Sequence, residues 1–312
     1  MLLLHRLRAR RQAPMPFIVG APRSGTTMLR LMLDAHPELA IPPETGFLRI
    51  VPELRGWGDA LRERFFQAVT TFPANAPAWE DFQIPAEEFR ARLAGIRPFH
   101  AADGVRLFYR MYAARFGKPR WGDKTPLYSR HLLDIRKLLP EARFIHLVRD
   151  GRDVAVSLRE RWFSPGRDIA VQAAFWRDHV AAARDQGRAC PHFLEVRFED
   201  LVRDPETMLG RICDFAGLEL RPEMLFYPQR AARRLEEHGA RHTADGAVLA
   251  SREERLRQQA HTHRPPDPAK IGVWRRELSA EEARIFEEIA GGLLAAYSYH
   301  LDVKKELRRA LP

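Results

Sequence analysis

The sequence predicts an α/β fold in which helices flank a central parallel β-sheet, because one pattern occurs three times. Residues 16–20, 143–148 and 192–198 are short apolar runs typical of buried strands. Each run is followed by a loop and then by a segment with helical spacing of its apolar residues. Strands that alternate with helices pair in parallel, so we expect the three runs to form one sheet.

The first strand–loop–helix unit has the clearest boundaries, because glycine and proline residues mark them. The run PFIVG at 16–20 ends in glycine, and residues 25–35 carry leucine and methionine at helical spacing. Prolines at 37, 42 and 43 then leave room for only a short extended piece at 38–41.

A helical insertion is predicted at about residues 52–116. Proline clusters break this stretch into helical segments, and it shows no clear strand pattern. Such an insertion is a candidate for shaping an acceptor pocket. Its aromatic residues cannot be told from core residues by pattern; they include Phe65, Phe66, Trp79 and Tyr109.

The remaining elements follow the second and third strands. Asp204 and Pro205 suit the N-cap and first turn of a helix that reaches about Ala216. We expect a single domain over residues 16–312, preceded by a basic N-terminal arm at 1–15. Further helices are expected at 153–161, 168–186, 221–227, 247–260 and 279–299.

Composition and charge limit the possible functions. The chain has 312 residues and a formal charge of +10, which favours anionic partners. The arginines are scattered rather than gathered in one stripe, so we do not expect nucleic-acid binding. Four apolar residues before a basic run are too few for a signal peptide or a transmembrane segment, which favours a cytoplasmic protein. Cys190 and Cys213 are expected to be reduced thiols.

The loop GAPRSGTT, residues 20–27, has the features of a phosphate-binding loop. Backbone N–H groups and a helix N-terminus there direct positive partial charge at one point, and two threonines add hydroxyl donors. Nucleotide triphosphatases have lysine after the second glycine, where this chain has Thr26. The cation is instead Arg23, whose planar fork suits a single 5′-phosphate that carries a transferable group. The alternative is an ordinary strand-to-helix turn.

The segment RSGTTMLRLMLDAHPELAIPPETGFLR, residues 23–49, resembles the 5′-phosphosulfate loop of the sulfotransferases that use 3′-phosphoadenosine-5′-phosphosulfate (PAPS). The similarity is greatest to the protein-tyrosine and bacterial branches, and it implies a P-loop-type sandwich fold. It also implies that Glu44 is the catalytic base. Gly46 stands where the tyrosine-sulfating branch has arginine, which puts acidic-peptide recognition in doubt. The residues implied to hold the 5′-phosphosulfate are Arg23, Ser24, Gly25, Thr26 and Thr27.

A second segment, RDGRDVAVS at 149–157, follows the second strand. In the resembled family the matching arginine and serine bind the 3′-phosphate of the cofactor, which assigns Arg149 and Ser157 to it, together with Arg161. Two phosphate sites on one sheet suit a bisphosphorylated nucleotide. The alternative is a solvated cluster of charges at the start of a helix.

Three further positions follow from the same resemblance. Phe198 replaces the tyrosine usual beside the adenine, Lys270 lies in a loop that closes over the cofactor, and Lys124 in WGDKTPLY approaches the bridging oxygen where charge develops. We assign Lys124 that role together with Arg23. The alternative for Lys124 is a salt bridge to Asp123 or a cap at the start of a helix.

Histidines give no metal signal. His36 precedes a proline and is expected to hydrogen-bond the backbone. The pairs His238 with His242 and His261 with His263 lack a supporting Cys or HExxH pattern, so we interpret them as surface residues. Sulfuryl transfer requires no metal.

The resulting hypothesis is a sulfotransferase that moves a sulfuryl group from PAPS to a hydroxyl or amine acceptor by in-line displacement. The acceptor is a small molecule, glycan, lipid or peptidyl hydroxyl group that the sequence does not identify. Two alternatives remain: a P-loop kinase or nucleotide phosphatase, and a non-catalytic protein that binds a nucleotide or glycan on the same fold.

Overall fold

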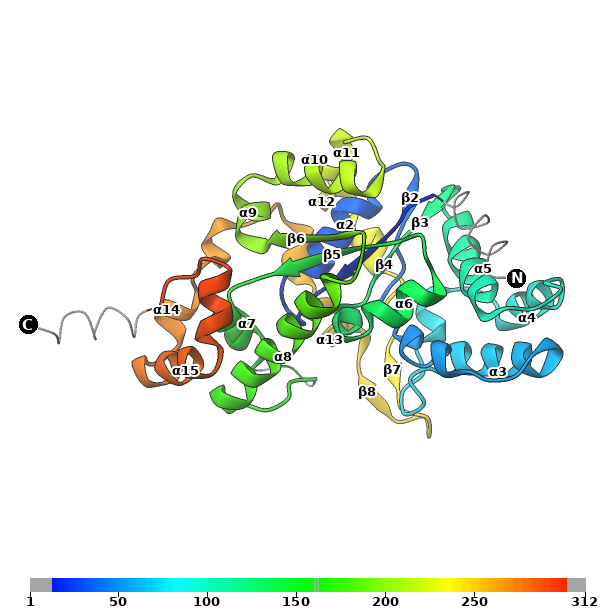
Figure 1. Cartoon of the computed structure of the whole chain (residues 1–312), viewed down its shortest axis with the longest axis horizontal. Helices are drawn as coiled ribbons and strands as arrows, with labels where there is room; N and C mark the ends of the chain where they lie inside the picture. The colour runs from blue at the N-terminus through cyan, green and yellow to red at the C-terminus, as the bar shows by residue number, and fades with distance from the viewer. Residues whose placement is uncertain (1–12, 160, 162, 302–312) are drawn as a thin grey trace, which may run out of the picture.

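A parallel sheet with strand order β4-β1-β5-β6 lies at the centre of the molecule (Figure 1). The computed structural model describes residues 13–159, 161 and 163–301. The α/β fold with a central parallel sheet is therefore confirmed. The strands are β1 (Met15–Val19), β4 (Asp123–Lys124), β5 (Ala142–Val148) and β6 (Phe193–Arg197).

Both faces of the sheet are covered, which explains why its inner strands are continuous apolar runs. Successive side chains of β1 point to opposite faces: Phe17 joins the core under the insertion, and Ile18 joins the core on the other side. Every residue of β1 is buried.

Helices pack on the two faces in separate groups (Figure 1). One group surrounds Trp176 and Phe286, which are fully buried. The other surrounds Leu29, Leu209 and Ile212. The first group contains α7 (Gly151–Leu158), α8 (Ile169–Gly187) and α15 (Ala280–Ala296); the second contains α2 (Thr26–Asp34), α9 (Phe198–Arg203), α10 (Pro205–Ala216), α11 (Pro222–Leu225) and α12 (Pro228–Leu235).

Polar residues start two of these helices, and the cap at Asp204 confirms the one that the sequence predicts. The Asp204 carboxylate accepts a hydrogen bond from the Thr207 backbone N–H, and Pro205 occupies the first turn of α10. Ser279 and Glu282 form a capping box at the start of α15.

Between residues 52 and 116 the chain is helical and lies beside the edge strand β4 (Figure 1). Phe65, Phe66, Trp79 and Tyr109 are at most 9% exposed, so they are core residues. Arg106 of this segment forms a bidentate ion pair with Glu141 next to β5. The elements here are η2 (Val51–Glu53), α3 (Gly58–Thr70), η3 (Trp79–Phe82), α4 (Ala86–Ala94) and α5 (Ala101–Ala114).

The central sheet contains one strand more than predicted, β4, and the structure differs from the predicted elements in three other places. The third strand ends at Arg197, and Phe198 begins helix α9 where a loop was expected. The predicted helix at 247–260 begins instead as strand β8 (Val248–Ala250), which pairs with β7 (Arg241–His242). Met15 already lies in β1, which shortens the predicted arm, whose residues 1–12 lie outside the described part of the chain.

Short elements connect the larger ones. β2 pairs in parallel with β3, and this places the segment before Glu44 beside the segment before Lys124. The bounds are η1 (Phe47–Arg49), β2 (Leu39–Ala40), β3 (Arg120–Trp121), η4 (Pro126–Arg130), α6 (Leu132–Leu138), α13 (Arg252–Gln258), η5 (Ala260–His263), η6 (Pro268–Lys270) and α14 (Trp274–Glu277).

The carboxyl ends of the four strands of this sheet meet at one edge, where ligands bind in open α/β sheets. β1 runs into the loop at Gly20, β4 ends at Lys124, β5 runs into Arg149, and β6 runs into Phe198. Among the described helices, none combines the length and the apolar character that a membrane span requires.

Candidate active site at the carboxyl edge of the sheet

The loop between β1 and α2 has a backbone that requires its glycines. Gly20 and Gly25 have φ angles of 154° and 92°, in the region that favours glycine. A Cβ atom would lie 2.5 Å from the Leu147 carbonyl oxygen at Gly20 and 2.5 Å from the Phe198 ring at Gly25. Arg23 also has a positive φ, of 71°, so the loop holds its arginine in a strained conformation.

Arg23 joins the two predicted phosphate segments. Its Nε donates a 3.1 Å hydrogen bond to Ser157 Oγ on α7, and its carbonyl oxygen accepts one of 3.3 Å from Arg149 Nη1. The pKa of Arg23 is lowered to about 10, because burial disfavours its charge and because Arg161 and Arg149 lie close by. Three arginines gathered in this way make a site for an anion.

Arg149 is fixed from several sides at the end of β5. Its guanidinium lies 4.6 Å from the centre of the Phe198 ring, and its Nη2 donates a 2.7 Å hydrogen bond to the Lys270 carbonyl oxygen. Its Nε is buried and has no hydrogen-bond partner within the part of the chain that the structure describes. The pKa of Arg149 is lowered by burial, which the charge of Asp153 opposes.

The alternative of a solvated charge cluster at 149–153 is wrong. Arg149 is 9% exposed and Arg152 is fully buried between Asp150 and Glu287. Asp153 accepts hydrogen bonds from the backbone N–H groups of Gly272 and Trp274, which attaches the C-terminal loop to α7.

Glu44 and Lys124 form an ion pair in which Glu44 Oε1 lies 2.6 Å from Lys124 Nζ. Thr27 Oγ1 lies 3.5 Å from the same nitrogen, so Lys124 also reaches the phosphate loop. The Lys124 side chain is 5% exposed and that of Glu44 is 51% exposed. Burial lowers the pKa of Lys124, and the charge of Glu44 opposes this shift.

A buried hydrogen-bond network supports this ion pair through the next residues along the chain. Thr45 Oγ1 donates to Asp123 Oδ2 over 2.7 Å and lies 2.8 Å from the Tyr128 hydroxyl. Tyr109 donates a 2.8 Å hydrogen bond to the same Asp123 oxygen. Burial raises the pKa of Asp123 to about 6. Among the described residues Lys124 forms its salt bridge with Glu44 and not with Asp123, whose Oδ2 accepts hydrogen bonds from Thr45 and Tyr109.

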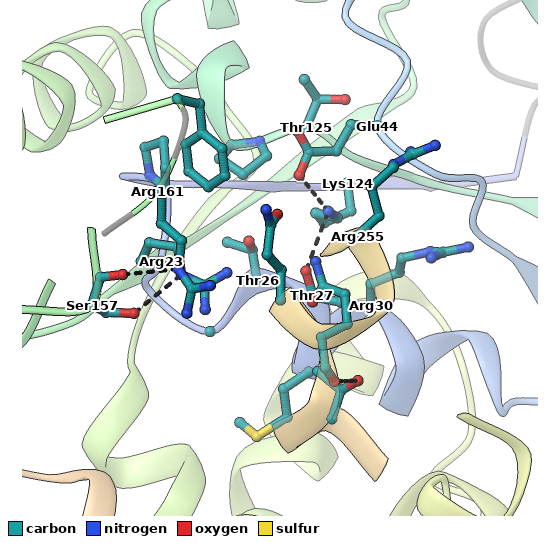
Figure 2. A pocket seen from close by; sticks show the side chains of 18 of the residues that line it. Arg23, Thr26, Thr27, Arg30, Glu44, Lys124, Thr125, Ser157, Arg161 and Arg255 are labelled. Carbon is teal, nitrogen blue, oxygen red and sulfur yellow. Dashed lines mark hydrogen bonds and ion pairs between the residues drawn. The ribbon is translucent and has the colours of Figure 1, made fainter. Parts of the chain in front are cut away.

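One cavity of about 900 Å³ connects these groups. The residues that the sequence assigned to the site line it, except Ser24, whose side chain is fully buried. Figure 2 shows Arg23, Ser157 and Arg161 on one side of it and Glu44 and Lys124 on the other, with Thr26 and Thr27 between.

Comparison with known proteins identifies the family. The model of the Sulfotransferase family matches residues 14–222, which include all of these groups except Lys270. The chain belongs to the sulfotransferase family. Membership makes it a transferase of sulfuryl groups in the general sense.

Individual relatives of this sulfotransferase are distant. It is 29% identical to "Nodulation protein NoeE" of Sinorhizobium fredii over 92% of this chain and 67% of that protein. It is 25% identical to "Protein-tyrosine sulfotransferase A" of Caenorhabditis elegans and 27% identical to "Protein-tyrosine sulfotransferase" of Drosophila melanogaster. These matches cover 76% and 70% of this chain, but only 59% and 41% of the two relatives.

Solved structures show the same fold. The sulfotransferase domain from the curacin biosynthetic pathway matches with a TM-score of 0.57 and 20% identity, over 93% of this chain and 99% of that one. The sulfotransferase domain of the Synechococcus PCC 7002 olefin synthase matches with a TM-score of 0.54 and 24% identity, over 90% and 96%.

The far wall of the cavity in this sulfotransferase consists of residues that no sequence motif indicates. Arg30, Asp81, Arg241 and Arg255 line it, and so does His238, which was interpreted as a surface residue. Asp81 comes from the insertion and Arg241 from β7, 160 residues later, so no local pattern relates them.

The remaining histidine predictions have simple outcomes. His36 Nε2 lies 3.0 Å from the Glu219 carbonyl oxygen, so its bond to the backbone is confirmed. Among the described residues, no group of three or more His, Cys, Asp or Glu residues is placed to hold a metal ion. The side chains of His261 and His263 lie outside the described part of the structure.

Proposed function

We propose that this sulfotransferase transfers a sulfuryl group from PAPS to a hydroxyl or amine acceptor by in-line displacement, with Glu44 as the base. The observation that carries the proposal is the link from Arg23 to Ser157 and Arg149, which joins two anion subsites in one cavity that also contains the Glu44 and Lys124 ion pair.

The residues present fit an anionic nucleotide with phosphates at two positions. Arg23, Arg149 and Arg161 lie close together, and the charges of Arg161 and Arg149 add to burial in lowering the pKa of Arg23, so an anion between them would be stabilised. Among the described residues, Arg149 Nε and Ser24 Oγ are buried polar atoms without hydrogen-bond partners, so both retain hydrogen-bonding capacity. The start of α2 adds backbone N–H donors.

PAPS, when bound, would supply the activated sulfuryl group. The α2 N-terminus with Thr26 and Thr27 would hold the 5′ side, and Arg149 with Ser157 and Arg161 the 3′-phosphate. Phe198 would lie beside the base, and Lys270 would contact phosphate from the C-terminal loop.

Glu44 and Lys124 would act together on the acceptor and the leaving group. The acceptor hydroxyl would give its proton to the Glu44 carboxylate as its oxygen attacks sulfur. Lys124, with Arg23, would donate hydrogen bonds to the bridging oxygen, where negative charge develops as the old bond breaks. The 2.6 Å contact between Glu44 and Lys124 keeps base and cation in one place before the acceptor arrives.

Three further expectations are independent of the proposed reaction. A single domain over residues 16–312, the lack of a metal requirement and the cytoplasmic location all stay predictions. A kinase or nucleotide phosphatase is the main competing function, and it lacks support because Thr26 occupies the place of the loop lysine.

The testing experiment is a calorimetric titration of the full chain with adenosine 3′,5′-bisphosphate, with ADP and ATP–magnesium in parallel. We expect the bisphosphate to bind at least tenfold more tightly than ADP, since Arg149 and Ser157 contribute charged hydrogen bonds to its 3′-phosphate. Preference for ATP–magnesium would overturn the proposal in favour of a kinase. Turnover of sulfur-labelled PAPS in the presence of an acceptor panel then separates an enzyme from a non-catalytic binding protein.

A further inference from the structure

The wall of the cavity beyond Glu44 and Lys124 contains a second group of cations. We call it the distal cluster: Arg30 on α2, Arg241 on β7, Arg255 on α13, and the neighbouring His238 and Asp81. The family model ends at residue 222, so His238, Arg241 and Arg255 belong to a segment that the family match does not cover.

The distal cluster has more arginines than carboxylates. Asp81 is its one carboxylate in the described structure, and it accepts hydrogen bonds from Arg241 over 2.7 Å and from both Nη atoms of Arg255 over 2.8 and 2.7 Å. Arg30 is 1% exposed, and its partner Glu237, at 3.4 Å, is shared with Arg115 and Arg234. Buried positive charge without matching negative charge is costly, so an anion in the cavity would be stabilised.

The surroundings of His238 contain the same excess of positive charge. Arg255 Nη2 lies 3.1 Å from His238 Nδ1, and because arginine only donates, this nitrogen accepts and Nε2 carries the proton. Burial and the charges of Arg255 and Arg30 lower the pKa of His238 well below its usual value. His238 is therefore a neutral hydrogen-bond donor in a positive environment.

The distal cluster lies beside the proposed base. Burial lowers the pKa of Arg241, whereas the charges of Asp81 and Glu44 act in the opposite direction. In Figure 2, Arg30 and Arg255 lie on the same side of the cavity as Lys124 and Glu44, opposite Arg23 and Arg161. An anion bound there would belong to the acceptor, because the proposed nucleotide subsites lie at Arg23 and Arg149.

We infer that the acceptor carries an oxyanion near its reacting hydroxyl group and that Arg241 and Arg255 bind this oxyanion. A carboxylate is the oxyanion that we expect. The inference rests on the proposed function, whose acceptor site it describes. Asp81 illustrates the chemistry, since Arg255 already holds its carboxylate in a bidentate pair, the geometry that arginine favours. Removing the Asp81 charge should then strengthen acceptor binding, whereas removing either arginine charge should weaken it.

The test uses matched fluorescent phenols and the full chain saturated with adenosine 3′,5′-bisphosphate. The neutral probe is 4-methylumbelliferone, and the anionic probes are 7-hydroxycoumarin-4-acetate and 7-hydroxycoumarin-4-methanesulfonate, titrated where the phenol stays protonated. We expect the carboxylate to bind about tenfold or more tightly than the neutral probe, as for charged hydrogen bonds. The sulfonate arm shows whether a tetrahedral oxyanion binds as well as a planar one.

Four variants make the result specific. Arg241→Gln and Arg255→Gln should remove most of the preference for the anionic probes, and each leaves Asp81 with one arginine. Asp81→Asn should increase the preference, a change that a purely structural role does not produce. Arg284→Gln, in an exposed pair on α15, is the control and should change nothing.

The possible outcomes are distinct. Equal binding of neutral and anionic probes, no binding of the carboxylate, or a preference that survives Arg241→Gln would overturn the inference. Weaker anion binding in Asp81→Asn would also overturn it. Because the bisphosphate titration is done on the same protein, its failure would be visible separately as a failure of the proposed function.

Discussion

Glu44 Oε1 and Lys124 Nζ lie 2.6 Å apart although 80 residues separate them in the chain. The contact depends on the pairing of β2 with β3 and on β4, the short strand that ends at Lys124. It also leaves Glu44 half exposed to the cavity, where an acceptor can replace water around its carboxylate.

Replacing Glu44 by glutamine should stop catalysis without preventing cofactor binding. The amide keeps the size of the side chain but cannot accept the acceptor proton, so we expect turnover to fall by about a hundredfold or more. Calorimetry should show an unchanged affinity for adenosine 3′,5′-bisphosphate. Glu53→Gln, at an exposed position in η2, is the matched control. Normal turnover in Glu44→Gln would assign the base to another residue.

Arg149→Ala should weaken binding of adenosine 3′,5′-bisphosphate by about 2 kcal/mol, the usual scale of a lost hydrogen bond to a charged group. ADP lacks the 3′-phosphate and reports on any general damage, such as the loss of the contact to the Lys270 carbonyl. We expect the ADP affinity to change much less. An equal loss for both nucleotides would show that Arg149 supports the fold of the site and does not read the 3′-phosphate.

The network around Thr45 predicts an effect on turnover at a distance. Tyr128→Phe removes the hydroxyl that contacts Thr45 Oγ1 and accepts from the Leu48 N–H, which loosens the segment after Glu44. We expect kcat to fall while the bisphosphate affinity stays constant, with a stability loss of about 1 kcal/mol. Tyr297→Phe, which breaks a hydrogen bond to Glu195 away from the cavity, should affect stability alone. The idea fails if the two variants have the same kinetic parameters.

These residues show which parts of the fold and of the site can be predicted from the sequence. The glycine loop, Arg149 and Glu44 were predictable because each lies within a contiguous motif beside a strand or a proline turn. β4 was not, since two residues carry no periodic pattern and depend on pairing with Phe17 and Ile18 of β1. The burial of Arg152 was also missed, because its partner Glu287 lies 135 residues away.

The distal cluster could not be predicted from the sequence either, because its members lie far apart in the chain. His238 was interpreted as a surface residue because no Cys or HExxH pattern accompanies it. The folded chain instead places its Nδ1 3.1 Å from Arg255 Nη2, and the charges of Arg30 and Lys124 help to lower its pKa. Likewise, Phe198 was predicted only as a stacking ring. In the structure its ring also fills the space next to Gly25, which explains why Gly25 has no room for a side chain. The guanidinium of Arg149 lies over the same ring.

That steric relation predicts the outcome of Gly25→Ala. A Cβ atom at Gly25 would meet Phe198 at 2.5 Å in a backbone conformation of positive φ, so the loop and the ring cannot both keep their places. We expect a large loss of bisphosphate affinity together with lower thermal stability. Gly210→Ala is the control: its Cβ would meet nothing within 4 Å inside α10, and it should stabilise the protein by up to about 1 kcal/mol. Full nucleotide affinity in Gly25→Ala would contradict the role of this glycine.

The buried Asp123 carboxyl predicts a specific dependence of stability on pH. Burial raises its pKa from 3.8 to about 6, so folding favours the protonated form. Its stabilising contribution is therefore fully present below pH 4 and is lost as the pH rises through about 6. A shift of this size corresponds to roughly 3 kcal/mol. Asp123→Asn keeps an oxygen that accepts from Thr45 and Tyr109 but does not titrate. The free energy of unfolding of the variant relative to the parent protein should thus increase between pH 4 and pH 7, as denaturant titrations at several pH values can measure. A difference that stays constant over this range would mean that Asp123 has the same pKa in the folded and unfolded chains, and would contradict the effect of burial on this carboxyl group.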